Sequence, residues 1–409
     1  MKRWLAGLCC IGMLFMSGCA WIAFHPVESP ADPKPPASSK PAYLSEYKDK
    51  WCYRQLNPRL QKAYAALYET VREYEQDMTI AISDGKGGRT DHIGLRVELP
   101  EALCGRAETQ LLYNAFTTDN PAFFYVGNTY SYEGYEQDGQ EYYHVFCLVL
   151  TMTAAERTVA QKQLDAVVND WLAALPKDAS AIDTELYFHD RLAARCSYDK
   201  TVAESKNPSE THAQAFTAYG ALVNGRAVCE GYSRAMQLLM HRAGMECTLV
   251  SGFGEGASHM WNMVTVDGRS YHVDVTWDDA DDLLRHTFFN LTTADIQLTH
   301  EIDSENIGLI TCTAESGNYY TYKGTYLNTF DPLVIGLAIA EQMRDGATAV
   351  DLRFPQDKFD NARLLFSNSR RLRSYVNEHF QEGEPLLKKY TYQLNTVYRT
   401  ITLYPETDQ

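Results

Sequence analysis

Basic residues are scarce in this chain. Its 409 residues include 37 lysines and arginines against 53 aspartates and glutamates, so the formal net charge at pH 7 is −16. A surface of this sign repels the phosphates of nucleic acid and the anionic headgroups of lipids. The sequence therefore argues against a nucleic-acid partner and against a basic patch as the means of membrane attachment.

Metal and nucleotide motifs are also missing from the sequence. No two cysteines have the spacing of a zinc site, and His189 and His286 lack the i, i+4 histidine partner of a helical zinc site. We expect both histidines at the surface. Gly252, Gly254 and Gly256 follow a predicted strand, but the apolar helix that a phosphate-binding loop requires does not follow them. The sequence therefore predicts neither a metal nor a cofactor.

The apolar run at the amino terminus is too short to span a membrane. It extends from Trp4 to about Met16, follows two basic residues and precedes two small residues and Cys19, so residues 1–18 have the layout of a signal peptide. The small pair before Cys19 resembles a bacterial lipoprotein processing site. That resemblance implies a mature chain that begins at an acylated Cys19 and is lipid-anchored to a cell membrane, on its extracytoplasmic side. The alternative is an ordinary cleaved signal and a free secreted protein.

The rest of the chain divides by composition. Residues 19–42 are rich in proline and serine and are typical of a semi-extended tether. Residues 43–409 are too many for one ordinary domain, and the chain has the 45% apolar content needed to bury cores. We expect an amino-terminal α/β region over 43–175, a central domain over 176–315 and a carboxy-terminal α/β region over 316–409. The last region is either a recognition module or a flank packed on the core.

Periodicity predicts the elements of both flanking regions. In the first, an apolar helical stripe starts at Leu60, and a T-A-A-E capping box at Thr153 starts a long helix that ends before Pro176. The strand-like segments there are MTIAIS, HIGLRVEL and YYHVFCLVLTM. In the last region, helices are expected near Leu333 to Arg344 and over 359–380. Its strand-like segments are NYYTYKGTYL, TAVDLRF, YTYQL and YRTITLY.

Six cysteines of the expected folded body have no assigned chemistry and could form up to three bridges in an oxidising compartment. They are Cys52, Cys104, Cys147, Cys196, Cys247 and Cys312. Cys147 and Cys247 lie within apolar, strand-like stretches. We therefore expect these two as packed hydrophobic residues.

A seventh cysteine, Cys229, lies at the start of a predicted helix. The apolar positions that follow it fall on one helical face, and Gly244 supplies the stop. At a helix start, the positive end of the helix dipole favours thiolate over thiol. Cys229 is therefore placed to be a nucleophile.

Two strands, Met260 to Val266 and Arg269 to Thr276, are predicted, and an Asp-Gly turn joins them. His259 directly precedes the first strand, and Asp274 lies within the second. A two-residue loop sets residue 259 opposite 276 and residue 261 opposite 274. Because side chains alternate along a strand, both polar side chains then point to the same face. A four-residue loop preserves this, and a three-residue loop does not. Asp278 and Asp279 are rival carboxylates beyond the expected strand.

The motifs C-E-G-Y-S, H-M-W-N and V-D-V-T-W resemble those of the transglutaminase-like superfamily of papain-like cysteine enzymes, especially its bacterial secreted members. The resemblance covers about residues 187–290. It implies an α+β fold with a papain-like core, in which 176–315 is the catalytic domain. By resemblance, Cys229 is the nucleophile, His259 the general base and acid, and Asp274 the residue that orients the imidazole.

The expected chemistry is acyl transfer or hydrolysis at protein or peptide amides, with water or an amine as acceptor. Gln214 and Tyr219 are candidates for the second oxyanion donor, and neither is chosen. Two alternatives remain open: a cysteine peptidase acting on cell-surface peptides, and a non-catalytic binding or scaffolding module at the cell surface. A reactive sulfur at Cys229 distinguishes an enzyme from a binding module.

Overall fold

The computed structural model describes residues 3–10, 47–83, 89–205, 212–279 and 284–407. These residues form two compact units: Met1–Ser270 with Glu301–Thr311, and Tyr271–His300 with Cys312–Gln409. Cys19 and the proline-rich tether lie outside the described residues, and the described part of the expected signal peptide, Arg3–Cys10, forms strand β1. Within the described part of the chain, no helix is long and apolar enough to cross a membrane.

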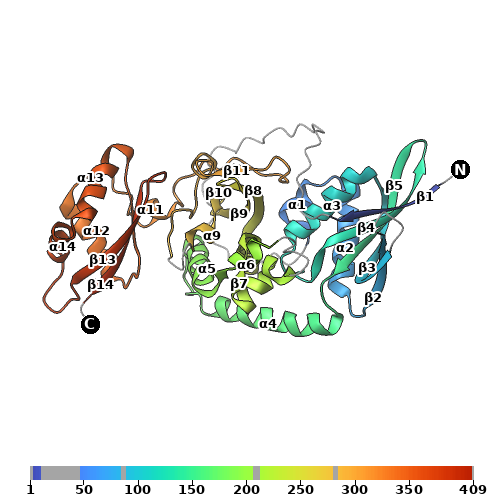
Figure 1. Ribbon diagram of the computed structural model, residues 1–409, viewed down its shortest axis with the longest axis horizontal. Coiled ribbons are helices and arrows are strands. Elements are labelled where there is room, and N and C mark those ends of the chain that lie inside the picture. Colours follow the sequence, from blue (N-terminus) through green and yellow to red (C-terminus); the bar gives the residue numbers. More distant parts are fainter. Residues whose placement is uncertain (1–2, 11–46, 84–88, 206–211, 280–283, 408–409) are drawn as a thin grey trace. The chain divides into compact units, whose positions relative to one another are not determined.

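The first unit begins with a five-stranded antiparallel sheet, order β1-β4-β5-β3-β2. The predicted strands of this region are confirmed, and the helices α2 and α3 pack on the sheet (Figure 1). The elements are β1 (Arg3–Cys10), α1 (Trp51–Gln55), α2 (Pro58–Glu73), β2 (Met78–Ser83), β3 (Arg89–Cys104), α3 (Gly105–Asp119), β4 (Val126–Gln137) and β5 (Gln140–Leu150).

Helix α2 buries the apolar stripe that the sequence predicts. Asn57 accepts a hydrogen bond from the Leu60 amide, and a proline at the first helical position suits the fixed φ of that residue. Tyr64 is fully buried against Phe116 of α3, with ring centroids 5.5 Å apart. Apolar burial on one face therefore ties α2 to α3 and to the sheet.

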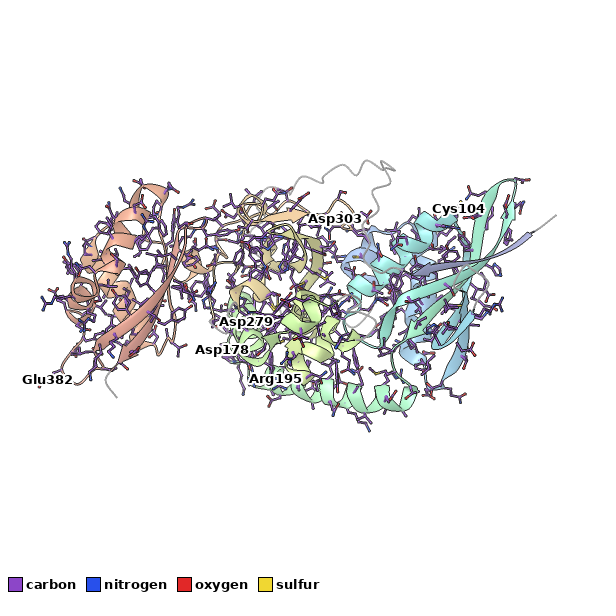
Figure 2. All side chains as sticks on the ribbon, viewed as in Figure 1. Cys104, Asp178, Arg195, Asp279, Asp303 and Glu382 are labelled. Atoms are coloured by element: carbon purple, nitrogen blue, oxygen red, sulfur yellow. The ribbon has the colours of Figure 1, made fainter. Side chains whose placement is uncertain are left out.

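A long helix connects the sheet to the following helices (Figure 1). It is α4 (Ala154–Ala173), with the predicted capping box between Thr153 and Glu156, and α5 (Ala181–Arg195) comes next. Arg195 is the last residue of α5 (Figure 2). Its guanidinium donates to the carbonyls of Leu222 (3.1 Å) and Val223 (2.8 Å). The short elements of this stretch are β6 (Ser197–Tyr198), α6 (Lys200–Ala203), η2 (Ala213–Phe216), η3 (Gly220–Asn224) and β7 (Arg226–Ala227).

The central elements of the first unit are a buried helix and an antiparallel pair of strands. They are α8 (Cys229–Arg242), β8 (Glu246–Gly254) and β9 (Ala257–Val266). Gly244 has φ +78° and ends α8 as predicted. After β9 come β10 (Arg269–Val273) and, farther on, β11 (His300–Ile302).

The second unit contains a three-stranded antiparallel sheet with helices on one face (Figure 1). The predicted helix over 359–380 is two helices that break at Asn368, whose side chain caps the second. The segment NYYTYKGTYL is not a strand, because Tyr319–Tyr322 forms the short helix α11. The other elements are α9 (Val275–Asp278), α10 (Thr293–Ile296), α12 (Pro332–Arg344), β12 (Val350–Arg353), α13 (Gln356–Ser367), α14 (Ser369–Asn377), β13 (Leu387–Asn395) and β14 (Thr400–Thr407).

Among the described residues, the seven cysteines of the folded body form no disulfide. Cys147 lies in β5 and Cys247 in β8, and both are buried, which confirms that they pack as hydrophobic residues. Burial raises the pKa of both thiols. In the part of the chain that it describes, the structure therefore forms none of the disulfide bridges that the sequence allows.

A buried lysine lies beside the carboxyl-terminal end of α8. Lys50 Nζ is 3.4 Å from His241 Nδ1, and His241 Nε2 is 2.8 Å from the Cys247 carbonyl oxygen. Since a carbonyl only accepts, Nε2 carries the proton and Nδ1 accepts from the lysine. Burial lowers the pKa of Lys50 to about 8, although the nearby Asp119 carboxylate opposes the shift. Keeping Lys50 protonated in the folded protein therefore costs free energy.

This cost predicts a pH-dependent stability. An unfolded lysine keeps its proton to about pH 10.4, so between pH 8 and that value the unfolded chain binds more protons and stability rises with pH. In denaturant titrations, wild type should gain up to about 3 kcal/mol over Lys50→Met across this window. The exposed Lys48→Met variant is the matched control and should follow wild type. Parallel curves for wild type and Lys50→Met would contradict the prediction.

Candidate active site

Cys229 is the first residue of α8, as predicted. Val228 precedes it in an extended conformation and its side chain makes no capping bond, while its amide donates to the Ala215 carbonyl (3.0 Å). Cys229 itself is partly exposed, whereas most of the helix after it is buried. The sulfur is therefore attached at the positive end of a helix that is otherwise in the core.

The glycine of the C-E-G-Y-S motif allows this helix start to lie against a neighbouring backbone. A Cβ on Gly231 would be 2.5 Å from the Ala215 carbonyl oxygen and 3.2 Å from that of Thr217. It would also lie 2.6 Å from the Ala227 Cβ. Backbone atoms cannot move aside as a flexible side chain can. Gly231 thus fixes how closely the first turn of α8 approaches the segment around η2.

Replacing Gly231 by alanine should destabilise the protein. Helix propensity alone favours alanine by about 1 kcal/mol, but overpacking against fixed backbone costs about 1–3 kcal/mol beyond that gain. We expect a net loss in the free energy of unfolding, measured by denaturant titration. A variant as stable as wild type, or more stable, would show that the close approach is not maintained in solution.

His259 lies on β9, opposite Gly252 of β8. Its side chain is buried, and its ring stacks with Trp261 at a centroid distance of 6.0 Å and an interplanar angle of 20°. Gly252 also approaches the next segment closely, since a Cβ there would be 1.9 Å from the Glu301 carbonyl oxygen. The pair of strands β8 and β9, which carries His259, therefore packs closely against the segment at Glu301.

One serine joins the helix of Cys229 to the strand of His259. The Ser233 hydroxyl is 2.9 Å from the carbonyl oxygen of Cys229 and 2.9 Å from that of Met260, the residue after the histidine. A hydroxyl has one proton, so the two carbonyls share it. Asn262 Nδ2 donates to the Ser233 carbonyl (3.0 Å) and reinforces the junction. Hydrogen bonds therefore join the helix start to the strand of His259, close in sequence to both candidate residues.

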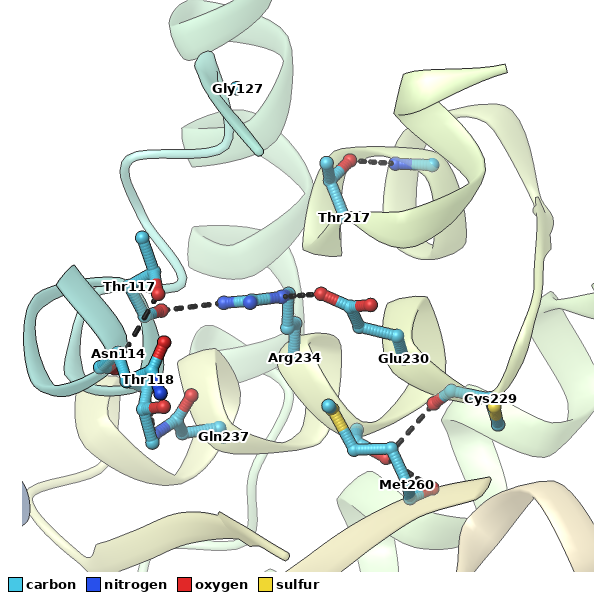
Figure 3. Close-up of polar contacts among 12 residues, drawn as sticks. Asn114, Thr117, Thr118, Gly127, Thr217, Cys229, Glu230, Arg234, Gln237 and Met260 are labelled. Atoms are coloured by element: carbon cyan, nitrogen blue, oxygen red, sulfur yellow. Dashed lines mark hydrogen bonds and ion pairs between the residues drawn. The ribbon is translucent and has the colours of Figure 1, made fainter. Parts of the chain in front are cut away.

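Further contacts anchor α8 to the end of α3. Arg234 donates to the Thr117 carbonyl (2.6 Å) and pairs with Glu230 (2.9 Å), and Gln237 donates to the Thr118 carbonyl (2.8 Å) (Figure 3). Sequence reasoning did not assign roles to Ser233, Asn262 or these residues. Ser233 and Asn262 are the last letters of two of the quoted motifs, so the motifs contained the signal.

The turn after β9 has the predicted length. Asp267 (φ +50°) and Gly268 (φ +74°) form it, and such a two-residue turn with both φ values positive is the tight hairpin type. Across it, Thr265 Oγ1 and Ser270 Oγ are 3.0 Å apart, as expected from the predicted register, in which residues 265 and 270 lie opposite each other. In this register, side-chain alternation still predicts that His259 and Asp274 point to the same face. A direct contact between them remains a prediction.

Asp274 itself is not in a strand, contrary to the expected strand to Thr276. β10 ends at Val273, and the Asp274 carboxylate accepts the amide of Trp277 (3.2 Å) as the N-cap of α9. Aspartate side chains commonly replace strand pairing with such local bonds. The backbone of Asp274 is still extended, with φ −127° and ψ 90°. Its side chain therefore continues the alternation of the strand by one residue.

Within its own unit, Asp274 has a partner that the sequence did not reveal. His300 Nε2 lies 3.1 Å from Asp274 Oδ2, and both side chains are almost completely buried. The rival Asp278 has another use, because both of its oxygens accept the Phe288 amide at 3.0 and 3.1 Å. Asp278 therefore secures a loop, and Asp274 stays the better candidate.

Of the two candidates for a second oxyanion donor, Tyr219 is engaged elsewhere. The Tyr219 hydroxyl donates to Gln163 Oε1 (2.6 Å), and its ring stacks on Phe124. Gln214 is exposed, and its Oε1 accepts from Asn224 (2.9 Å). These contacts give Tyr219 a structural use for its only proton.

His189 and His286 are not surface groups, which corrects the expectation from the sequence. His189 is fully buried and lies 2.9 Å from the Asp190 carboxylate. His286 is also buried, 2.6 Å from Asp351, and stacks on Tyr319. Each imidazole has a carboxylate partner in its own unit, which offsets the loss of hydration on burial.

Comparisons with known proteins agree with the motifs. Residues 171–275 match the model of the transglutaminase-like superfamily, so the chain carries a transglutaminase-like domain in an α+β fold. Kyphoscoliosis peptidase of Homo sapiens is 26% identical over 135 residues, and that of Mus musculus is 24% identical over 136 residues. Each match covers 30% of this chain and 19% of the relative, so the chain spans about a fifth of the length of these relatives. A solved structure described as a TGase matches at 15% identity over 45% of this chain and 50% of that chain, with a TM-score of 0.27.

Proposed function

We propose that the transglutaminase-like domain is a cysteine enzyme that performs acyl transfer or hydrolysis at protein or peptide amides. Cys229 is the nucleophile, His259 the general base and acid, and Asp274 the group that orients the imidazole. The observation that carries the proposal is the junction at Ser233, which ties the helix start of Cys229 to the residue after His259. Nucleophile and base must be held at hydrogen-bonding reach, and such a junction provides the rigid frame for it.

The reaction begins with attack of the Cys229 thiolate on an amide carbonyl carbon. The resulting oxyanion accepts hydrogen bonds from the Cys229 backbone amide and a second donor. His259, protonated in this state, gives its proton to the departing amine as the carbon–nitrogen bond breaks, and a thioester remains. Water or an amine then attacks the thioester while His259 removes its proton, and the thiolate leaves.

Asp274 fixes the tautomer and direction of the His259 ring in this scheme. A carboxylate accepts about four hydrogen bonds, so bonds from Trp277 and His300 leave capacity for a further donor. We assign that donor to the His259 ring. The register of the Asp267–Gly268 hairpin supports this assignment, because it puts residues 261 and 274 opposite each other and residue 259 on the same face.

The cysteine peptidase is the second candidate function. The curated relatives carry the name peptidase, and the same three residues would serve, since water replaces the amine as acceptor. Without a reactive sulfur, the same domain would be a cell-surface binding or scaffolding module.

One assay separates these activities. The full chain is incubated with dimethylcasein, with and without a fluorescent primary amine, and three products are followed: casein-bound amine, released ammonia and cleaved peptide bonds. Bound amine with released ammonia identifies a cross-linking acyltransferase, ammonia without bound amine a deamidase, and new peptide termini a peptidase. Each signal should disappear in Cys229→Ala. Absence of all three, together with an unreactive Cys229 thiol, would contradict the enzyme proposal.

We also propose that the protein is exported and anchored through acyl chains on Cys19, so that the mature chain lacks β1 and β4 becomes an edge strand of the first sheet. The layout of residues 1–18 and the acidic net charge of −16 support this, since the charge offers no electrostatic route to anionic lipid. Expressed in a bacterium, wild type should sediment with membranes and incorporate labelled palmitate. Cys19→Ala should lose the label and enter the soluble fraction, whereas Cys52→Ala should behave as wild type. A membrane-bound, labelled Cys19→Ala protein would contradict the anchor.

A further inference from the structure

His300, the first residue of β11, belongs to a chain of hydrogen bonds that begins at the backbone carbonyl of Asp295 and ends at the carboxylate of Asp274. The Tyr398 hydroxyl donates to the Asp295 carbonyl oxygen (3.0 Å). Tyr398 is also 2.8 Å from Thr299 Oγ1, and Thr299 Oγ1 is 2.9 Å from His300 Nδ1. The other ring nitrogen of His300, Nε2, lies 3.1 Å from Asp274 Oδ2. All of these residues belong to the second unit.

The direction of each bond follows once the Tyr398 proton is assigned to the Asp295 carbonyl, and the directions give the number of protons on the His300 ring. A carbonyl only accepts, so the single proton of Tyr398 is used on Asp295. Thr299 must then donate its own single proton to the Tyr398 oxygen. With that proton used, Thr299 can only accept from His300 Nδ1–H. The Asp274 carboxylate likewise accepts from Nε2–H, so both ring nitrogens carry protons.

The surroundings agree with a positive ring at this place. The ring of Trp277 lies 4.3 Å from the His300 ring, where the aromatic face attracts a cation. Arg353 and Asp295, 3.5 Å apart, are the other charged groups close to Tyr398.

We propose that His300 is a positioning residue which, as an imidazolium, donates to Asp274 and so holds the carboxylate that orients His259. This inference rests on the proposed function, because His300 acts through Asp274. The ion pair partly neutralises the negative charge that acts on His259. Asp274 therefore serves mainly to direct the His259 ring, and His300 keeps that ring from holding its proton to excessively high pH.

The test uses the full chain with histidine rings labelled by nitrogen-15. In wild type, the His300 ring at pH 7 should show both nitrogens protonated. In His300→Gln, whose amide can still donate to Asp274, the positive charge is lost, and the pH midpoint of the His259 titration should rise by about 0.5–1 unit. His286→Gln is the matched control, because it also removes a buried, carboxylate-bonded histidine of the second unit. Its His259 midpoint should equal that of wild type.

A His300 ring with one protonated nitrogen, or an unmoved His259 midpoint in His300→Gln, overturns the inference. An equal shift in His286→Gln also overturns it, since the effect would then be general loosening. Failure of the proposed function is detected separately, from the rate at which iodoacetamide alkylates Cys229 in wild type. An ordinary, unactivated thiol there rejects the enzyme, while the nitrogen-15 spectra still decide the state of His300.

Discussion

Cys229→Ala is expected to lose amide turnover by about 10⁴-fold or more, to the level of the uncatalysed reaction assisted by binding alone. The reason is that the thioester cannot form without the sulfur, and no other thiol among the described residues is the first residue of a helix. The measurement is the initial rate of whichever casein product wild type gives, with fold checked by circular dichroism. The loss should fall on kcat and leave binding of the substrate nearly unchanged.

The matched control is Cys147→Ala. This thiol is buried in β5, and burial raises its pKa, so it has no route to chemistry. We expect activity within about twofold of wild type and a modest loss of stability from the smaller side chain. If Cys147→Ala is as inactive as Cys229→Ala, the loss reports on folding. If Cys229→Ala keeps its activity, Cys229 is not the nucleophile.

Asp274→Asn is expected to lower kcat by about 10³–10⁴-fold. An asparagine amide can present an N–H where the carboxylate accepted, so the His259 ring is held in the wrong tautomer. The change also removes the charge that pairs with His300, and breaking a buried pair typically costs about 3–5 kcal/mol. Turnover must therefore be measured at a temperature where the variant is folded, with KM and kcat determined separately.

Asp278→Asn is the control for that experiment. Asp278 is fully buried four residues away, and its carboxylate accepts the Phe288 amide. The control should lose stability while the folded fraction keeps near-normal kcat. Equal losses of kcat per folded molecule in both variants would mean that Asp274 has only a structural role.

Local sequence signals predicted the elements that carry the candidate nucleophile and base. The Asp-Gly turn prescribes a two-residue hairpin, since both positions require positive φ, and the structure has that turn. The helix start at Cys229 and the stop at Gly244 follow from apolar periodicity and a glycine cap. These signals depend on residues adjacent in the chain, which is why a single sequence contains them.

Long-range partners could not be predicted in this way. His300 contacts Asp274 although 26 positions separate them in the sequence. The capping bond from the Trp277 amide to Asp274 spans only three positions, but it competes with strand pairing. The strand expected in NYYTYKGTYL failed for a related reason. Its tyrosines favour strands intrinsically, but Tyr319 and Tyr320 are both buried, so consecutive positions face the core and a short helix forms.

The measurement that tests the central claim most directly is the pH dependence of Cys229 alkylation by iodoacetamide in the full chain, compared with His259→Ala. An activated nucleophile predicts fast labelling well below the reference thiol pKa of about 8.5, and a marked slowing in the variant at the same pH. Labelling that rises only near the reference value and is the same in both proteins would contradict a cysteine enzyme and favour a binding module.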